Sequence, residues 1–166
     1  MEYARYQFKE SLQDAKINNY LALFMKSSRD GADRDETPLN SIICLDVSGS
    51  MNGGLGKSSK DQLSRLKLSI EAIKMFISKL RPNDSVGIIT FNKYAQQIIK
   101  PTFKSKLTNE VFAMLEEIKA NGGTTIRNGF NLSKELLQNF IKEKNCTNCE
   151  NRIIMLTDVG DNSFEN

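Results

Sequence analysis

The chain has 166 residues, of which 39% are hydrophobic and 26% charged, a composition typical of one soluble globular domain. A net charge of +3 is too small to indicate a nucleic-acid-binding protein. No apolar run reaches the ~20 residues of a membrane span, and the N-terminus lacks the apolar segment of a secretory signal. The absence of histidine removes the commonest catalytic base and metal nitrogen ligand.

The N-terminal part, residues 1–38, is a polar extension with one predicted strand, Tyr20–Ser27. The main domain, residues 39–166, begins with a predicted strand over Asn40–Asp46. This strand is apolar without alternation, which indicates burial on both faces, as in a parallel sheet.

A helix is predicted next, ending at Pro82, because proline cannot continue the interior of a helix. Its apolar residues recur every three or four positions and form one stripe: Leu63, Leu66, Ile70, Ile73, Ile77 and Leu80. Two strands follow, Ser85–Phe91 and Ala95–Lys100. The link between them is too short for a helical crossover, so they are predicted to form an antiparallel hairpin at the sheet edge.

Two further helices are predicted over Asn109–Lys119 and Ile126–Lys142, and a last strand over Arg152–Thr157. Strands that alternate with helices predict an α/β fold, a three-layer sandwich around a mostly parallel central sheet with one antiparallel edge strand.

Three polar clusters follow or separate these elements: Asp46-x-Ser48-x-Ser50, Gly122-Gly123-Thr124 and Thr157-Asp158. In an open α/β sheet, the loops at the carboxyl ends of the strands converge where the strand order reverses. Carboxylate and hydroxyl oxygens suit Mg²⁺, Mn²⁺ or Ca²⁺. The two carboxylates only neutralise a dication, and neutral hydroxyl ligands leave the ion attractive to a carboxylate from a partner.

Residues 39–161 resemble the von Willebrand factor A (vWA) family, which has a Rossmann-like fold. The resemblance rests on the three motifs that contain these clusters: DVSGSM, NGGTT and IIMLTD. The resemblance implies a metal-ion-dependent adhesion site (MIDAS) that binds Mg²⁺, or Mn²⁺ or Ca²⁺, through Asp46, Ser48, Ser50, Thr124 and Asp158. Thr125 is the alternative ligand to Thr124. The implied function is non-catalytic binding of a protein partner whose acidic residue completes the metal shell, with no membrane span and no nucleic acid.

The chain departs from this family at its C-terminal end. Val159 stands where the family usually has glycine, and the family normally adds two more strands after the position of Asp158. We therefore expect a C-terminally truncated domain that lacks its last strands. Its fourth strand would then be an exposed sheet edge, able to self-associate.

Other readings of the same residues remain. Asp46 and Ser48 could form only a helix-capping turn, and Thr124 could be only a helix cap. The domain could be a metal-independent assembly scaffold. The segment GGLGKSS resembles a phosphate-binding loop but has Met51 where the first glycine is required. A phosphoryl-transfer enzyme with Asp46 as the nucleophile would need an activating partner and a phosphate clamp.

The three cysteines point to no single role. Cys44 lies in an apolar strand and is predicted to be a core residue. Cys146 and Cys149 lie in a polar segment, and could be loop residues, a local disulfide, or a redox or shared metal site. An odd number of cysteines without a signal sequence favours a reducing, intracellular compartment.

Overall fold

The computed structural model describes residues 37–54, 63–146 and 148–158. The predicted strand Tyr20–Ser27, the end of the GGLGKSS segment and Val159 lie outside these residues. The described elements are β1 (Leu39–Asp46), the 3₁₀ turn η1 (Gly49–Asn52), α1 (Arg65–Lys79), β2 (Ser85–Phe91), β3 (Ala95–Phe103), the 3₁₀ turn η2 (Lys104–Lys106), α2 (Glu110–Glu116), α3 (Ile126–Lys144) and β4 (Glu150–Leu156).

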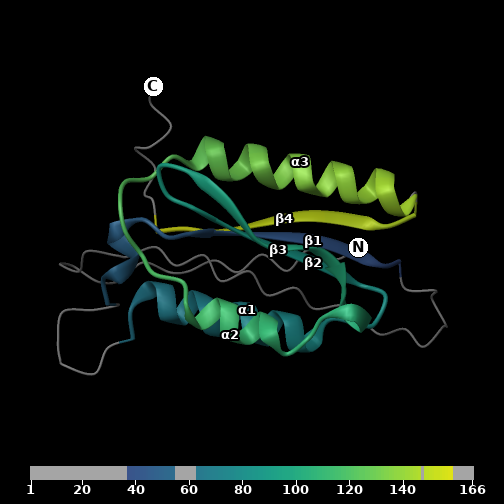
Figure 1. The fold of residues 1–166 in the computed structure, drawn as a ribbon, viewed down its shortest axis with the longest axis horizontal. Helices are drawn as coiled ribbons and strands as arrows, with labels where there is room; N and C mark the ends of the chain where they lie inside the picture. Colours follow the sequence, from purple (N-terminus) through teal and green to yellow (C-terminus); the bar gives the residue numbers. More distant parts are fainter. Residues whose placement is uncertain (1–36, 55–62, 147, 159–166) are drawn as a thin grey trace, which may run out of the picture. The chain divides into compact units, whose positions relative to one another are not determined.

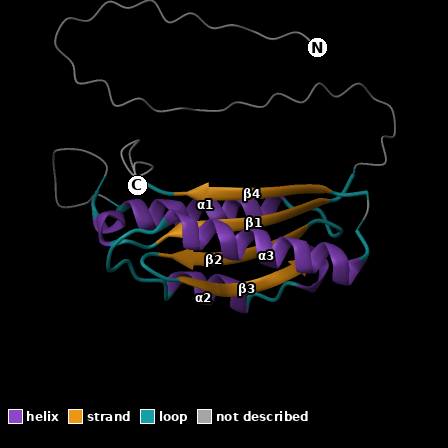
Figure 2. Ribbon diagram, turned by 90° about the horizontal axis from the view of Figure 1, so that it is seen from above, coloured by secondary structure: helices purple, strands orange, loops and turns teal. Residues whose placement is uncertain are grey.

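The strands form one mixed sheet in the order β3-β2-β1-β4 (Figure 2). β1 is parallel to both β2 and β4, and β2 is antiparallel to β3. Helix α3 covers one face of the sheet, while α1 and α2 cover the other (Figure 1). The structure thus confirms the predicted α/β three-layer sandwich with one antiparallel edge strand.

The core consists of two apolar clusters, one on each face of the sheet. Alternate residues of β1 enter different clusters: Ile43 and Leu45 pack against α1 and α2, whereas Ile42 and Cys44 pack under α3. This division explains why β1 has an unbroken apolar sequence. Gly129 allows α3 to approach closely, because a Cβ at this position would lie only 2.7 Å from Phe91 Cγ and 2.8 Å from Cys44 Sγ.

Strand β3 extends beyond its predicted end at Lys100 and continues through Pro101 to Phe103. Proline is tolerated because β3 is an edge strand, and its pairing with β2 has register shifts around Ile88. Gly87 makes room for the proline ring, since a Cβ there would lie 2.9 Å from Pro101 Cγ. The prediction that this strand ends at Lys100 was therefore wrong.

Smaller corrections concern the helices. α1 begins at Arg65, so Leu63 precedes it and is exposed rather than part of the packed stripe. α2 is shorter than predicted, and Phe130 of α3 is also exposed. In α3 the residues that face the sheet are Gly129, Ser133, Leu137 and Phe140, and this set leaves Phe130 on the solvent side.

The strand order places the reversal point beside β1. The chain moves from β1 to β2 on one side, and β4 later pairs on the other side of β1. Such a reversal point is where open α/β sheets bind ligands, outside the carboxyl ends of the strands. Asp46 ends β1, and Asp158 follows β4 by two residues. The predicted convergence of these two carboxylates is present.

Candidate metal centre

Asp46 is a fully buried carboxylate at the end of β1, with an exposed fraction of 0%. Its Oδ1 accepts a hydrogen bond from the backbone N–H of Ser48 at 2.7 Å, and its Oδ2 accepts one from the Thr157 hydroxyl at 2.6 Å. Both donors are neutral. Within the described residues, no lysine or arginine forms an ion pair with Asp46.

Two serine hydroxyls connect this strand end to the second carboxylate. The Oγ atoms of Ser48 and Ser50 are 3.0 Å apart, and the Ser50 hydroxyl donates to Asp158 Oδ1 at 2.8 Å. The turn η1 produces this arrangement by curving the chain directly after β1. Ser48 is buried, whereas Ser50 is exposed, so the row of oxygens runs from the core to the surface.

The loop between α2 and α3 lies directly against this turn. The Gly49 N–H donates to Gly122 O at 2.9 Å, and the Asn121 N–H donates to Val47 O at 2.7 Å. Asn92, which follows β2, holds the loop from the other side by donating from Nδ2 to Asn121 Oδ1 at 2.9 Å. Gly122 has φ +75°, a conformation that glycine adopts without steric cost.

Thr124 lies in this loop, with an exposed side chain and no hydrogen bond to any part of the chain that the structure describes. Its neighbour Thr125 precedes α3 without capping it through its side chain, and its backbone N–H donates to Asn92 O. The structure therefore links Asp46, Ser48, Ser50 and Asp158 by hydrogen bonds and places the Thr124 loop beside them, but it gives Thr124 no direct contact with the other four.

Two residues outside the predicted ligand set also take part. Thr157 bonds directly to Asp46, as described above. Arg65, the first residue of α1, donates from Nη1 to Asp158 Oδ2 at 3.1 Å and to Ser50 O at 3.0 Å. Thr157 belongs to the polar cluster that the sequence shows with Asp158, but its hydrogen bond to Asp46 was not predicted. Arg65 carries no such signal, because only the fold brings it to the site.

The donor set fits a hard divalent cation. It consists of carboxylate and hydroxyl oxygens, the ligand types that Mg²⁺, Mn²⁺ and Ca²⁺ prefer. Within residues 37–54, 63–146 and 148–158, no group of three or more His, Cys, Asp or Glu residues could hold a metal. A zinc-type site is thus absent from these residues, whereas a cluster of hydroxyls with two carboxylates is present.

The cysteines stand apart from this centre. All three are free thiols, and Cys44 is buried, where desolvation raises its pKa to about 11. Burial and the neighbouring Cys146 thiol raise the pKa of Cys149.

No helix in the described segments is both long and apolar enough to cross a membrane.

Comparison with known families identifies the class of this domain. The sequence profile described as "von Willebrand factor type A domain" matches residues 41–161, which is most of the chain. The chain belongs to the von Willebrand factor type A domain family. A search of curated protein sequences finds no significant match.

Solved structures of related fold include three informative examples. The PilB minor pilin from Streptococcus sanguinis matches 64% of this chain and 28% of its own length, with 23% identity and a TM-score of 0.55. The SpRpn10 VWA domain matches 72% and 58%, with 13% identity and a TM-score of 0.55.

Three N-terminal domains of the type V pili tip protein Mfa5 from Porphyromonas gingivalis match 72% of this chain and 19% of that structure, with 14% identity and a TM-score of 0.53. This chain therefore spans between 19% and 58% of these three structures. At such identities the likeness establishes the fold, and none of the three names is that of an enzyme.

Proposed function

We propose that this domain is a non-catalytic, divalent-cation-dependent protein-binding module with a MIDAS-type site. Its Mg²⁺, replaceable by Mn²⁺ or Ca²⁺, would be held by Asp46, Ser48, Ser50, Thr124 and Asp158. A bound dication would supply an electrophilic coordination position for a carboxylate of the partner protein. The family assignment and the donor set described above support this proposal.

The observation that carries the proposal is the burial of Asp46 with no lysine or arginine paired to it among the described residues. Removing a carboxylate from water is costly unless a cation or several strong hydrogen bonds offset the lost hydration. Asp46 is completely buried, yet in the part of the chain that the structure describes its carboxylate accepts hydrogen bonds from a backbone N–H and a neutral hydroxyl. A dication beside the Asp46 carboxylate would offset this cost.

The neighbouring hydroxyls favour binding of a partner. Ser48 and Ser50 are neutral, so they contribute oxygen atoms without cancelling the charge of the ion. An ion held in this way remains electron-poor and attracts a further anionic ligand. The exposed position of Ser50 and of the Thr124 loop leaves that side of the site open to a partner.

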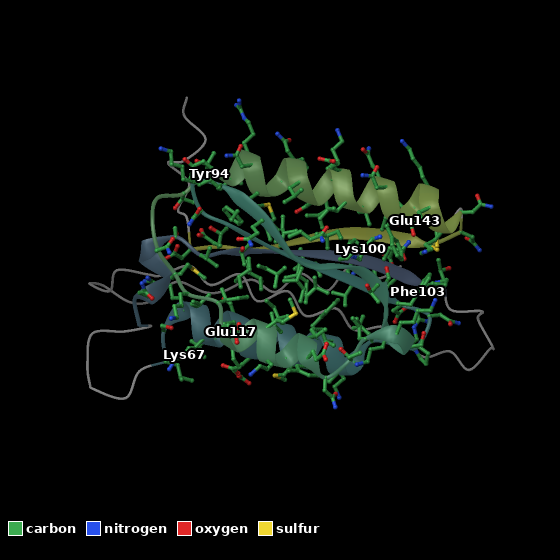
Figure 3. All side chains as sticks on the ribbon, in the orientation of Figure 1. Lys67, Tyr94, Lys100, Phe103, Glu117 and Glu143 are labelled. Atoms are coloured by element: carbon green, nitrogen blue, oxygen red, sulfur yellow. The ribbon has the colours of Figure 1, made fainter. Side chains whose placement is uncertain are left out.

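The proposal is tested by titrating the domain with Mg²⁺ and Mn²⁺ in a calorimeter and comparing Asp46→Asn with the native protein. Asparagine keeps the size of the side chain and can still bond to Ser48 and Thr157, so the fold should remain. We expect loss of metal binding by at least about 100-fold, because one charged ligand is removed. Glu117→Gln is the matched control. Glu117 is exposed and lies outside the ligand set, and its substitution removes the same single negative charge (Figure 3).

An intact, folded native domain that takes up neither ion would contradict the proposal. So would an Asp46→Asn variant that binds as tightly as the Glu117→Gln variant. Circular dichroism on each variant establishes that the fold is retained.

A second candidate function, metal-independent assembly, is favoured by one observation. In the part of the chain that the structure describes, β4 pairs only with β1, and its apolar residues Ile153–Leu156 are half-buried. An unpaired strand edge can accept a strand from another chain. This function predicts self-association in light scattering that a chelator does not reverse, whereas the cation-dependent function predicts partner binding that a chelator abolishes.

A further inference from the structure

The two carboxylates of the candidate metal centre differ in their charged neighbours. Asp46 is fully buried, and within the described segments its carboxylate is hydrogen-bonded only to neutral donors. Asp158 is about one-sixth exposed, with a side-chain fraction of 16%, and forms an ion pair with Arg65. Among the residues that the structure describes, Arg65 therefore supplies a positive charge to one proposed metal ligand, Asp158, and no residue supplies one to the other, Asp46.

Arg65 is held in this position by more than the ion pair. Its Nη1 atom also donates to Ser50 O, and its backbone N–H donates to Gly53 O at 2.9 Å. Gly53 leaves space for the guanidinium, since a Cβ on Gly53 would lie 2.7 Å from Arg65 Nη1. The guanidinium thus bridges the turn after β1 and the carboxylate after β4.

The location of Arg65 on its helix also matters for its charge. It is the first residue of α1, where the helix dipole disfavours a positive charge. Its ion pair with Asp158 offsets that disadvantage. An exposed lysine, Lys67, lies two residues further along the same helix, and its side chain has no contact with the site among the described residues (Figure 3).

We infer that Arg65 is a built-in counter-ion that makes the metal-loaded site selective for an anionic partner. This inference rests on the proposed function. Two carboxylates and one guanidinium leave one net negative charge, so a bound dication gives the centre one net positive charge. Arg65 weakens the affinity for the metal alone and strengthens the attraction of the loaded site for a carboxylate.

The test is calorimetric titration of Mn²⁺, with and without acetate, into the native domain, Arg65→Gln, Arg65→Lys and Lys67→Gln. Acetate is the probe for the partner's carboxylate. A positive side chain within about 4–6 Å of a carboxylate weakens the binding of another cation to that carboxylate by about tenfold or more. Partial exposure favours the low end of that range. We therefore expect Arg65→Gln to bind Mn²⁺ about tenfold more tightly, and Lys67→Gln to stay within about twofold of the native affinity.

Loss of Arg65 should weaken the effect of acetate, although it strengthens the binding of Mn²⁺. In the native domain it should raise the apparent Mn²⁺ affinity, because acetate that joins the metal shell is linked to metal binding. In Arg65→Gln this increase should be roughly threefold smaller, since the loaded site has lost one positive charge. Arg65→Lys should behave like the native domain in both titrations, because lysine keeps the charge.

Equal Mn²⁺ affinities for Arg65→Gln and Lys67→Gln, or an unchanged effect of acetate in Arg65→Gln, would overturn the role of Arg65 while leaving the metal site intact. Arg65→Lys behaving like Arg65→Gln would also overturn it, because the effect would then depend on side-chain shape. Absence of Mn²⁺ binding in every folded variant, the native domain included, would instead contradict the proposed function and with it this inference.

Discussion

Gly122 shapes the backbone of the loop beside the candidate site. Its positive φ of +75° aims its carbonyl at the Gly49 N–H in the turn after β1. Gly123, the next residue, has φ outside that range, and a Cβ there would meet nothing within 4 Å. The two adjacent glycines therefore have different requirements, although the sequence motif presents them as equivalent.

This difference predicts the outcome of two alanine substitutions. Gly122→Ala should lower the free energy of unfolding by about 1 kcal/mol, because alanine is disfavoured at positive φ. Gly123→Ala should change it by no more than about 0.5 kcal/mol, and could stabilise by restricting the unfolded chain. Urea denaturation of the two variants measures both values, and equal effects would contradict the assigned role of Gly122.

Single residues also show how far the sequence alone predicts the site. The motifs pointed to Asp46, Ser48, Ser50 and Asp158, and the structure joins these four in one hydrogen-bonded row. Arg65 was not predictable, since a basic residue at a helix start has no distinctive spacing. Its role depends on the packing of α1 beside the turn after β1, which is a tertiary property.

At the scale of elements, the ion pair between the buried Asp84 and the partly exposed Arg81 joins β1 to the turn between α1 and β2. Asp84 Oδ1 accepts from the Leu39 N–H at 2.9 Å and from Arg81 Nη2 at 2.8 Å. Its Oδ2 accepts from Arg81 N and Nε. Burial by itself raises the pKa of Asp84, but the bonds from Arg81 and from the two backbone N–H groups outweigh it and lower that pKa.

The lowered pKa predicts an acid-sensitive contribution to stability. Because the folded pKa lies below the ordinary value of 3.8, the ionised carboxylate stabilises the fold fully above about pH 4. This contribution should disappear as the pH falls through the folded pKa. Asp84→Asn should cost about 2 kcal/mol at pH 7, because it removes hydrogen bonds to a charged group. The variant should also show a flatter loss of stability below pH 4 in urea denaturation. An equally steep loss in both proteins would contradict this assignment.

The order and type of the elements followed from hydrophobic patterning. Each helix and strand that was predicted within the described residues is present in the structure, although several begin or end at other residues. Strand β3 shows why ends are harder to predict. Proline normally terminates a strand. Pro101 is accommodated because β3 is an edge strand, its pairing with β2 has register shifts, and Gly87 of β2 leaves room for the ring. These conditions arise from pairing between strands, which no local sequence window contains.

At the scale of the whole molecule, the proposed metal should stabilise the fold. A ligand that binds only the native state adds about 2.7 kcal/mol at a concentration 100 times its dissociation constant. For a domain of this size that corresponds to a rise in Tm of roughly 5–10 °C. Differential scanning calorimetry should show this rise on adding saturating Mg²⁺, its reversal by a chelator, and its absence in Asp46→Asn. The same rise in Asp46→Asn would place the stabilising ion elsewhere.

We propose above that oxygen atoms at the carboxyl ends of β1 and β4 hold a divalent cation. The most direct measurement is a crystal structure of the domain grown with Mn²⁺, with anomalous diffraction recorded at a wavelength where manganese scatters strongly. We predict an anomalous peak within bonding distance of Asp46, Ser48 or Ser50, with Thr124 and Asp158 bound to the ion directly or through a water molecule. An ordered site with native side-chain positions and no peak there would contradict it.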